Sequence, residues 1–448
     1  WGLTLLEWTP VASRHARAAV TGSLKWTAGA IHARRITTVP RDGDVAPQPA
    51  VLARPLPAEL AGIELFEVTL SRIAGRPRLG VAYDGARGCY VAAVFCESRA
   101  FELLDPEDQE LMLDAHGSFI AAFGRDAAAC NTIQWGVRSL PSGLAAAREY
   151  AHAHRREGMT ADDVSDLAMR ELLDDDTAGN EAETWLAILV DTHTLTGRRL
   201  VRQHGGGRQG ALAVVADEMT RVVGELARIG AHDDADGRLI PDGRGLAAML
   251  QDGLDPYGRR EREQPVMNAL PGVAMDEWGP AGRLAGWGHV TFDGSLSCTL
   301  EVAGMPEHDV RGTFLARLLT GWGVGCCSFH MRVLSRDEAD RVAAREKQKA
   351  HAERGLRARL GLMASARKER QEGSTWTLAE QLADGHALVR YGGVVTVAVP
   401  YERGPVGLRE AVGRAQDRAH DAGVRLRPVW GDQAAAATLS LPLCRGWK

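Results

Sequence analysis

Lysine is scarce in this 448-residue chain: only five of its 53 basic residues are lysine. No lysine directly follows a glycine. A Walker-type phosphate loop needs Gly-Lys followed by Ser or Thr, because the ammonium group must reach the β- and γ-phosphates of the nucleotide. The sequence therefore excludes a motor ATPase of this type.

Several reactive motifs are missing as well. No Ser-x-Gly triplet occurs, which excludes the nucleophile elbow of the α/β-hydrolases, and no His-Glu-x-x-His occurs, which excludes that zinc protease motif. The seven cysteines include no Cys-x-x-Cys pair, so buried free thiols are expected rather than a disulfide framework or a zinc site. We therefore predict a chain that is not an enzyme and needs no cofactor or metal.

Long apolar runs are also lacking. No uninterrupted stretch of 18 apolar residues is present that could span a membrane. The chain begins at Trp1 rather than Met, and we expect further residues, with a membrane anchor, upstream of it. Residues 1–35 alternate apolar positions with Arg and His. This segment is expected either to lie on a membrane surface or to form the edge of a core.

Charge and composition indicate a soluble globular chain. The formal net charge is −5, which gives no global basic signal for nucleic acid. Hydrophobic residues make up 45% of the chain and charged residues 25%, as is usual for globular proteins.

Runs of apolar or alternating residues predict a series of strands and helices. Strands are expected at 79–83, 90–96, 132–138, 185–190, 296–302, 329–333 and 424–429. Helices are expected to begin at Asp105, Thr160, Ala211, Pro306, Ser335 and Pro405. Two short strands, 387–391 and 394–399, are predicted to form a hairpin through Gly392-Gly393.

The two halves of the chain repeat one order of elements: strand, helix, strand, helices, strand, helix. This order predicts an α+β fold with two similar lobes, each a ferredoxin-like split α/β sandwich. The predicted boundaries are a membrane-proximal segment and linker at 1–60, a first lobe at 61–256, an inter-lobe connection at 257–290 and a second lobe at 291–448.

Residues 205–210 match the pattern G-x-G-x-x-G of dinucleotide-binding proteins. In that site a strand must end directly before the first glycine, so that the pyrophosphate meets the amino end of the helix. The preceding strand is expected to end near Thr192, about a dozen residues too early. A loop is therefore expected here rather than a nucleotide site.

The helix expected after Ser335 is strongly basic. Residues 341–370 hold ten Arg or Lys and three Glu, which gives 10 − 3 = +7. A helix that is polar on all sides projects into solvent or bridges to a partner. We favour an acidic protein surface as that partner, with nucleic acid or anionic lipid left open. The candidate contact residues are Arg345, Arg354 and Arg357.

A set of short motifs follows in a recognisable order. Their residues are Glu7, Trp8 and Pro10 in the entry segment; Phe101, Leu104, Asp105, Pro106 and Gln109 in a central motif; Gly205, Gly207 and Gly210 in the glycine-rich loop; Pro306, Phe314 and Leu315; and Gln433 and Pro442 near the end. In this order they resemble an actinobacterial family encoded with conjugation and type IV secretion genes. Met305 departs from the Trp that this family usually has before Pro306.

The resemblance covers nearly the whole chain and implies a non-catalytic, membrane-associated docking subunit. The two-lobed part is similar to the non-motor amino-terminal region of VirB/TrbE-type secretion ATPases. The implied partners are a separately encoded motor ATPase, small membrane subunits and the cytoplasmic membrane, which two helices upstream of Trp1 would reach while the lobes stay on the cytoplasmic face. An EccE-type subunit of a type VII secretion complex, and a cytoplasmic adaptor without a secretion role, remain alternatives.

Overall fold

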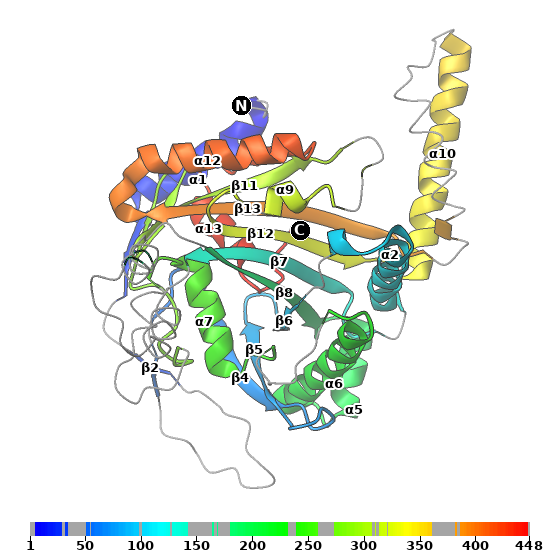
Figure 1. The fold of residues 1–448 in the computed structure, drawn as a ribbon, viewed down its shortest axis with the longest axis horizontal. Helices are drawn as coiled ribbons and strands as arrows, with labels where there is room; N and C mark the ends of the chain where they lie inside the picture. The colour runs from blue at the N-terminus through cyan, green and yellow to red at the C-terminus, as the bar shows by residue number, and fades with distance from the viewer. Residues whose placement is uncertain are drawn as a thin grey trace.

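The computed structural model describes residues 5–28, 32–34, 51–53, 55–97, 101–125, 128–141, 164, 168, 180–231, 239–258, 273–306, 310, 313–319, 321–360, 381–382 and 386–446. Their main feature is one twelve-stranded sheet in which every neighbouring pair of strands is antiparallel. Helices cover the sheet, and Figure 1 shows one further helix, α10, that extends away from the body. The predicted mixture of helix and sheet is thus confirmed at the level of class.

The first half of the chain supplies five strands and four helices in the described ranges. The strands are β4 (Ile63–Thr69), β5 (Arg78–Asp84), β6 (Cys89–Cys96), β7 (Thr132–Pro141) and β8 (Asn180–Asp191). The helices are α2 (Pro106–Ala121), α5 (Leu195–Gln203), α6 (Gly207–Arg228) and α7 (Gly243–Leu254), with short 3-10 turns η1 (Phe101–Leu103) and η2 (Ala122–Gly124) beside α2. The expected strands at 79–83, 90–96, 132–138 and 185–190 and the helices from Asp105 and Ala211 are confirmed; the helix from Thr160 lies outside the described residues, which include only 164 and 168 of it.

The second half supplies the rest of the sheet. Its strands are β9 (Gly282–Ala285), β10 (Val290–Phe292), β11 (Ser295–Gly304), β12 (Val324–Val333), β13 (Val389–Pro400) and β14 (Arg425–Pro428). Its helices are α9 (Ala316–Leu319), α10 (Arg336–Leu360), α12 (Gly404–Asp421) and α13 (Gln433–Ala437), with turns η3 (Tyr401–Arg403) and η4 (Thr438–Ser440). At the amino end lie α1 (Leu5–Val20) and β1 (Lys25–Thr27), and β2 (His32–Arg34) and β3 (Val51–Ala53) form a separate pair.

The two halves meet inside the sheet, where β7 pairs with β12. Trp135 stands opposite Phe329 in this pairing, and their rings stack with centroids 5.9 Å apart. Outward from this pair the strand order is β7, β8, β6, β5 in the first half and β12, β13, β11, β10 in the second. Both halves therefore use the same order of strands about a shared centre, and the sheet runs through both without a break.

Part of the segment predicted as a connection belongs to the sheet. β9 and the first residue of β10 lie within 257–290, and β9 pairs with both β1 and β10. Residues 259–272 of that segment lie outside the described residues.

The two faces of the sheet are covered differently. One face packs against α2, α6, α9 and α12 through two apolar clusters, with Trp135 and Met331 touching both. The opposite face is covered by α7, α13 and the carboxyl-terminal residues. Both faces are therefore buried at the centre of the sheet.

The predicted hairpin at Gly392-Gly393 is wrong, because β13 continues straight through both glycines. The reason is that side chains of the two neighbouring strands pack closely against Gly393. A Cβ at position 393 would lie 2.8 Å from the ring of Phe329 on β12 and 2.8 Å from Cγ2 of Val302 on β11. A glycine in a strand can mark the close approach of a neighbour as well as a turn.

Two helix starts also differ from expectation. Asp105 stands at the amino end of α2 with an extended backbone, but its side chain makes no capping hydrogen bond. Within the described ranges the helix expected from Pro306 appears only as the short α9, and Phe314 lies in a turn before it. Ser335 does cap α10 as predicted, since its hydroxyl accepts a hydrogen bond from the backbone N–H of Glu338 at 3.4 Å.

Candidate functional site

Helix α10 is largely exposed among the residues described. Its first turns are anchored to the body, where Ala339 and Ala343 are buried and Arg332 on β12 pairs with Glu338 at 3.2 Å. Beyond Ala343 the described side chains are exposed or half-buried. Figure 1 shows α10 extending away from the body. Its outer turns are thus available to a partner.

The three candidate arginines fall on two faces of α10. Arg345 is exposed and stands two residues after the buried Ala343, so it points roughly to the opposite side of the helix. Positions 354 and 357 follow Ala343 by eleven and fourteen residues, which returns them to the face of Ala343. The side chains of Arg354 and Arg357, and all of 361–370, lie outside the described part of the structure.

The sheet face opposite the large helices is unexpectedly polar. Gln134 and Arg138 alternate with apolar residues in the sequence, which is the pattern of a strand with one face in solvent, yet both are buried. They belong to a row of buried polar residues on neighbouring strands, which includes Ser328, His330, Thr396, Ser297 and Thr299. The alternating pattern therefore does not mark a solvent-facing side here, because the carboxyl-terminal segment covers these side chains.

Gln134 holds this segment in place. Its amide nitrogen lies 2.9 Å from the carbonyl oxygens of both Leu439 and Leu441, and its oxygen accepts a hydrogen bond of 2.6 Å from the N–H of Cys444. Arg87 donates to the carbonyl oxygen of Cys444 at 2.7 Å. The polar row therefore satisfies backbone groups that would otherwise be buried without partners.

His330 completes this contact by donating from Nε2 to the carbonyl oxygen of Leu439 at 2.8 Å. Burial, helped by the charge of Arg87, lowers the pKa of His330 to about 4, although the hydrogen bond to Leu439 raises it. The ring is therefore neutral at neutral pH.

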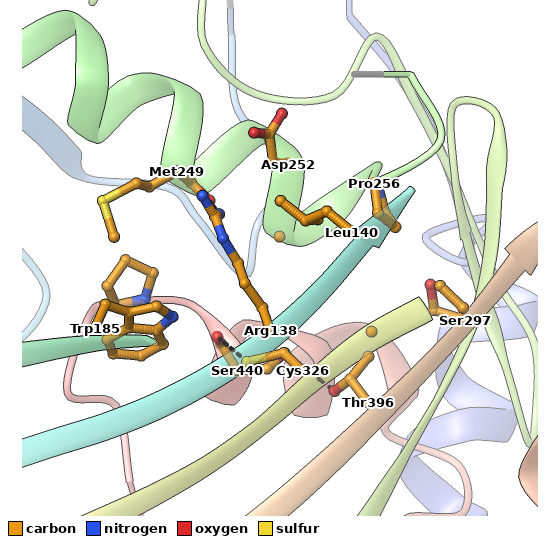
Figure 2. Close-up of a pocket in the computed structure, with 14 residues that line it drawn as sticks. Arg138, Leu140, Trp185, Met249, Asp252, Pro256, Ser297, Cys326, Thr396 and Ser440 are labelled. Atoms are coloured by element: carbon orange, nitrogen blue, oxygen red, sulfur yellow. Dashed lines mark hydrogen bonds between the residues drawn. The ribbon is translucent and has the colours of Figure 1, made fainter. Parts of the chain in front are cut away.

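A small cavity with both polar and apolar lining residues lies beside Arg138 (Figure 2). Its volume is about 10 Å³, room for about one water molecule. Arg138 is already engaged there: it pairs with Glu183 at 2.5 Å and donates to the carbonyl oxygen of Met249 at 2.9 Å. Figure 2 shows its side chain crossing from β7 toward the helix that carries Met249 and Asp252. We interpret this cavity as a packing feature that joins β7 to α7, too small for a substrate.

The cysteines are unpaired, and six of the seven are buried, as expected from the sequence. Desolvation raises the pKa of the Cys89 thiol to about 11 and that of Cys326 to about 12. A thiolate is the reactive form of cysteine, so these groups are poor nucleophiles in the folded protein. Across the described ranges, no three or more His, Cys, Asp or Glu side chains gather as a metal site would require.

The residues of the central motif contact one another. Gln109 on α2 donates from its amide to the carbonyl oxygens of Phe101 at 3.1 Å and Leu104 at 3.0 Å. Pro106 is at the start of α2, where the absence of an N–H costs nothing. These contacts hold η1 against the start of α2. The motif residues therefore stabilise a turn and do not form a chemical site.

The glycine-rich stretch lies between two helices. Helix α5 separates β8 from Gly205, and Gly205, Gly206 and Gly207 all have positive φ. A Cβ at Gly210 would lie 2.5 Å from the carbonyl oxygen of Val201, so this glycine lets α5 and α6 pack closely. The strand-turn-helix arrangement of a dinucleotide site is therefore not formed by these residues.

The remaining motif residues have packing roles. A Cβ at Gly423 would lie 3.0 Å from the ring of Pro306, while Phe314 and Leu315 pack half-buried against the apolar cluster that includes α12. Gln433 is buried, accepts from the N–H of Thr299 at 2.7 Å and donates to the carbonyl oxygen of Val429 at 2.6 Å.

Pro442 lines the small cavity. The residues that carry the resemblance are thus spread over the fold and meet at no common site.

The entry segment forms one edge of the core. Trp8 stacks on Trp287 with ring centroids 5.6 Å apart, and His15 meets the same ring edge-on at 5.0 Å. Pro10 lies within α1, and the side chain of Glu7 is outside the described part of the structure. These contacts favour the edge-of-core interpretation for this face of α1.

Neither known protein families nor curated proteins show a match to this chain. Among the described residues, no helix combines the length and the apolar character needed to cross a bilayer. The outer part of α10, with the exposed Arg345 and Lys349, is therefore the candidate binding site.

Proposed function

We propose that this chain is a non-catalytic docking subunit of a conjugation or type IV secretion-like machine, and that it recruits a separately encoded motor ATPase through α10. The docking role rests on one observation: α10 is basic, extends away from the body and has no buried described side chain beyond Ala343. A helix without an apolar face of its own suits electrostatic recognition of an acidic partner more than deep burial. The secretion context rests on the resemblance of the ordered motifs.

The state of the potentially reactive side chains supports binding over catalysis. The buried groups Gln134, Arg138 and His330 are committed to the carboxyl-terminal segment or to neighbouring backbone. The small cavity beside Arg138 has room for about one water. A role as a scaffold uses the rigid sheet to hold α10 in a fixed direction.

The proposal includes two ferredoxin-like lobes related by internal duplication. The matching strand order on either side of the β7–β12 pair supports this origin. Such a pair of lobes without a motor would be the counterpart of the non-motor region of secretion ATPases, and the energy would then come from another chain.

We also propose that the native protein is held at the cytoplasmic membrane, with small membrane subunits beside it and its lobes on the cytoplasmic face. This part rests on the resemblance, since the family carries two membrane helices before the entry segment. Fractionation of the full-length gene product tests it. Recovery entirely in the soluble fraction would remove the membrane assignment.

The docking proposal is tested by charge reversal. We expect Arg345→Glu, Arg354→Glu and Arg357→Glu together to reduce recovery of the ATPase encoded nearby in a pull-down by about tenfold or more, because like charges then face the acidic partner. The matched control reverses the exposed Arg403, Arg409 and Arg414 near and along α12, which changes the net charge equally.

Equal recovery with both triple variants would remove α10 from the interface. Absence of the ATPase from the wild-type pull-down would remove the docking function itself.

A further inference from the structure

A groove opens at the foot of α10, with a volume of about 330 Å³. Three segments form its walls: the end of α2 with η2, the junction of β12 with α10, and residues 386–388 before β13. Gly124 allows the first two walls to approach, since a Cβ there would lie 2.8 Å from the backbone oxygen of Leu334. The groove is thus built by elements of both halves of the chain.

The floor of the groove is apolar and its rim is mainly basic. Small and aliphatic residues line the floor: Ala121, Leu334, Ala339, Leu382, Ala387 and Leu388. The exposed rim carries Arg125 and Arg336 with His386, against the single carboxylate of Asp340. The two arginines and the one carboxylate give the rim a formal charge of 2 − 1 = +1. This charge favours a segment that brings both apolar and acidic side chains.

The groove leads onto one face of α10. Ala339 lines the groove, and the buried Ala343 follows it by one turn. Helical spacing then places positions 347, 350, 354 and 357 above them on the same face. This face joins the small residues at the foot of the helix to basic positions further out, whereas the exposed Arg341 and Lys349 lie on another side.

We infer that this groove and the α10 face above it bind one amphipathic helix of the motor ATPase, with apolar side chains in the groove and acidic side chains along α10. The inference rests on the proposed function and adds the binding mode and the chemistry of the partner segment. Helix-in-groove recognition uses apolar anchors at helical spacing. A volume of about 330 Å³ is at the low end of ligand pockets, so only a few anchors enter it. Small residues on the floor let the backbone of the partner come close.

The test compares basic residues inside and outside this surface. Affinity for the ATPase is measured by biolayer interferometry with the full chain. We expect Arg125→Glu with Arg336→Glu, and separately Arg354→Glu with Arg357→Glu, to raise Kd by about tenfold or more. Arg341→Glu with Lys349→Glu on another side of α10, and Arg403→Glu with Arg409→Glu near α12, should change Kd by less than about twofold.

A groove variant tests the apolar part. Leu382→Asp places a charge at a half-buried wall and should also raise Kd by about tenfold, with the thermal unfolding midpoint unchanged. If this variant fails to fold, the exposed rim pairs still decide. A peptide that copies an acidic amphipathic helix of the ATPase should displace the whole ATPase, and a scrambled peptide of equal composition should not.

The possible results distinguish a failure of the groove inference from a failure of the docking function. If all four basic pairs weaken binding equally, attraction is non-directional and the groove is not the site, while docking through charge stands. If the rim and groove variants bind the ATPase as well as wild type does, the groove is not the binding site, but the docking function stands. Loss of self-association in Leu382→Asp by light scattering would assign the groove to a second copy and overturn it. No binding by wild type removes both proposals.

Discussion

Helices α12 and α10 are both long and rich in charge, yet only α12 packs along its length. In α12 the residues Leu408, Ala411, Ala415 and Ala419 recur every three or four positions, and all are buried against the sheet. In α10 the same spacing begins with Ala339 and Ala343 but reaches Lys347 one turn later. A helix is buried only as far as its apolar stripe runs, so α10 leaves the body where its stripe ends.

The largest difference should come from one substitution made in both helices. Ala415→Asp places a carboxylate against the sheet, where burial without a partner costs about 5 kcal/mol of unfolding free energy. Ala344→Asp on the exposed side of α10 should cost about 0.5 kcal/mol, mainly through helix propensity. Urea unfolding of both variants measures the contrast. Similar losses would show that α10 is packed as closely as α12.

The next prediction extends the comparison to glutamines. Gln134→Leu leaves the carbonyl oxygen of Leu441 and the N–H of Cys444 without this partner inside the protein, and should cost about 4 kcal/mol. Gln348→Leu on α10 is the matched control, since that side chain is exposed and should change stability little. A small effect of Gln134→Leu in chemical denaturation would mean that the carboxyl-terminal segment is held by its apolar contacts alone.

The buried His330 should make the stability of the protein depend on pH. The unfolded chain takes up a proton at His330 near the ordinary pKa of 6.5, whereas the folded chain does so only near the pKa of about 4. The unfolded state therefore binds more protons between these values, and stability falls as the pH drops through this window, by at most about 3 kcal/mol.

His330→Gln keeps a donor for Leu439 and should flatten this part of the pH profile, measured as thermal midpoint against pH. If the wild-type slope survives in His330→Gln, another group is responsible for it.

The smallest stability effect is expected for Arg345→Glu, because this exposed position on α10 has no described ion pair that the change would break. We expect a change of about 0.5 kcal/mol or less in unfolding free energy. Differential scanning calorimetry on wild type and variant checks this. A clear drop in the midpoint would indicate that α10 contacts the body beyond Ala343.

The sequence predicted most of the central strands correctly because their apolar runs are long and bounded by turn residues. The residues at 90–96 and 185–190 are almost wholly apolar, and both became central strands buried on both faces. The helix ending near Gly230 was also clear, since its apolar residues keep helical spacing for several turns. These signals are local and need no knowledge of neighbouring elements.

The errors arose where a distant element decides the environment. Gly392-Gly393 has the local chemistry of a turn, but side chains from β11 and β12 require glycine at position 393 within a strand. The signal for the candidate site was partly visible: the positive charge of α10 is in the sequence, whereas the groove at its foot joins residues more than 200 positions apart.

The sequence by itself therefore determined most of the strands and helices, the absence of a Walker motif and the charge of α10, because each depends on residues close along the chain. Tertiary structure decided that β7 and β12 join both halves in one sheet and that Gln134 is buried rather than exposed. The physical reason is that a polar side chain is stable inside a protein only when partners satisfy it, and the partners of Gln134 come from residues 305 to 310 positions away. Local pattern carries no information about such partners.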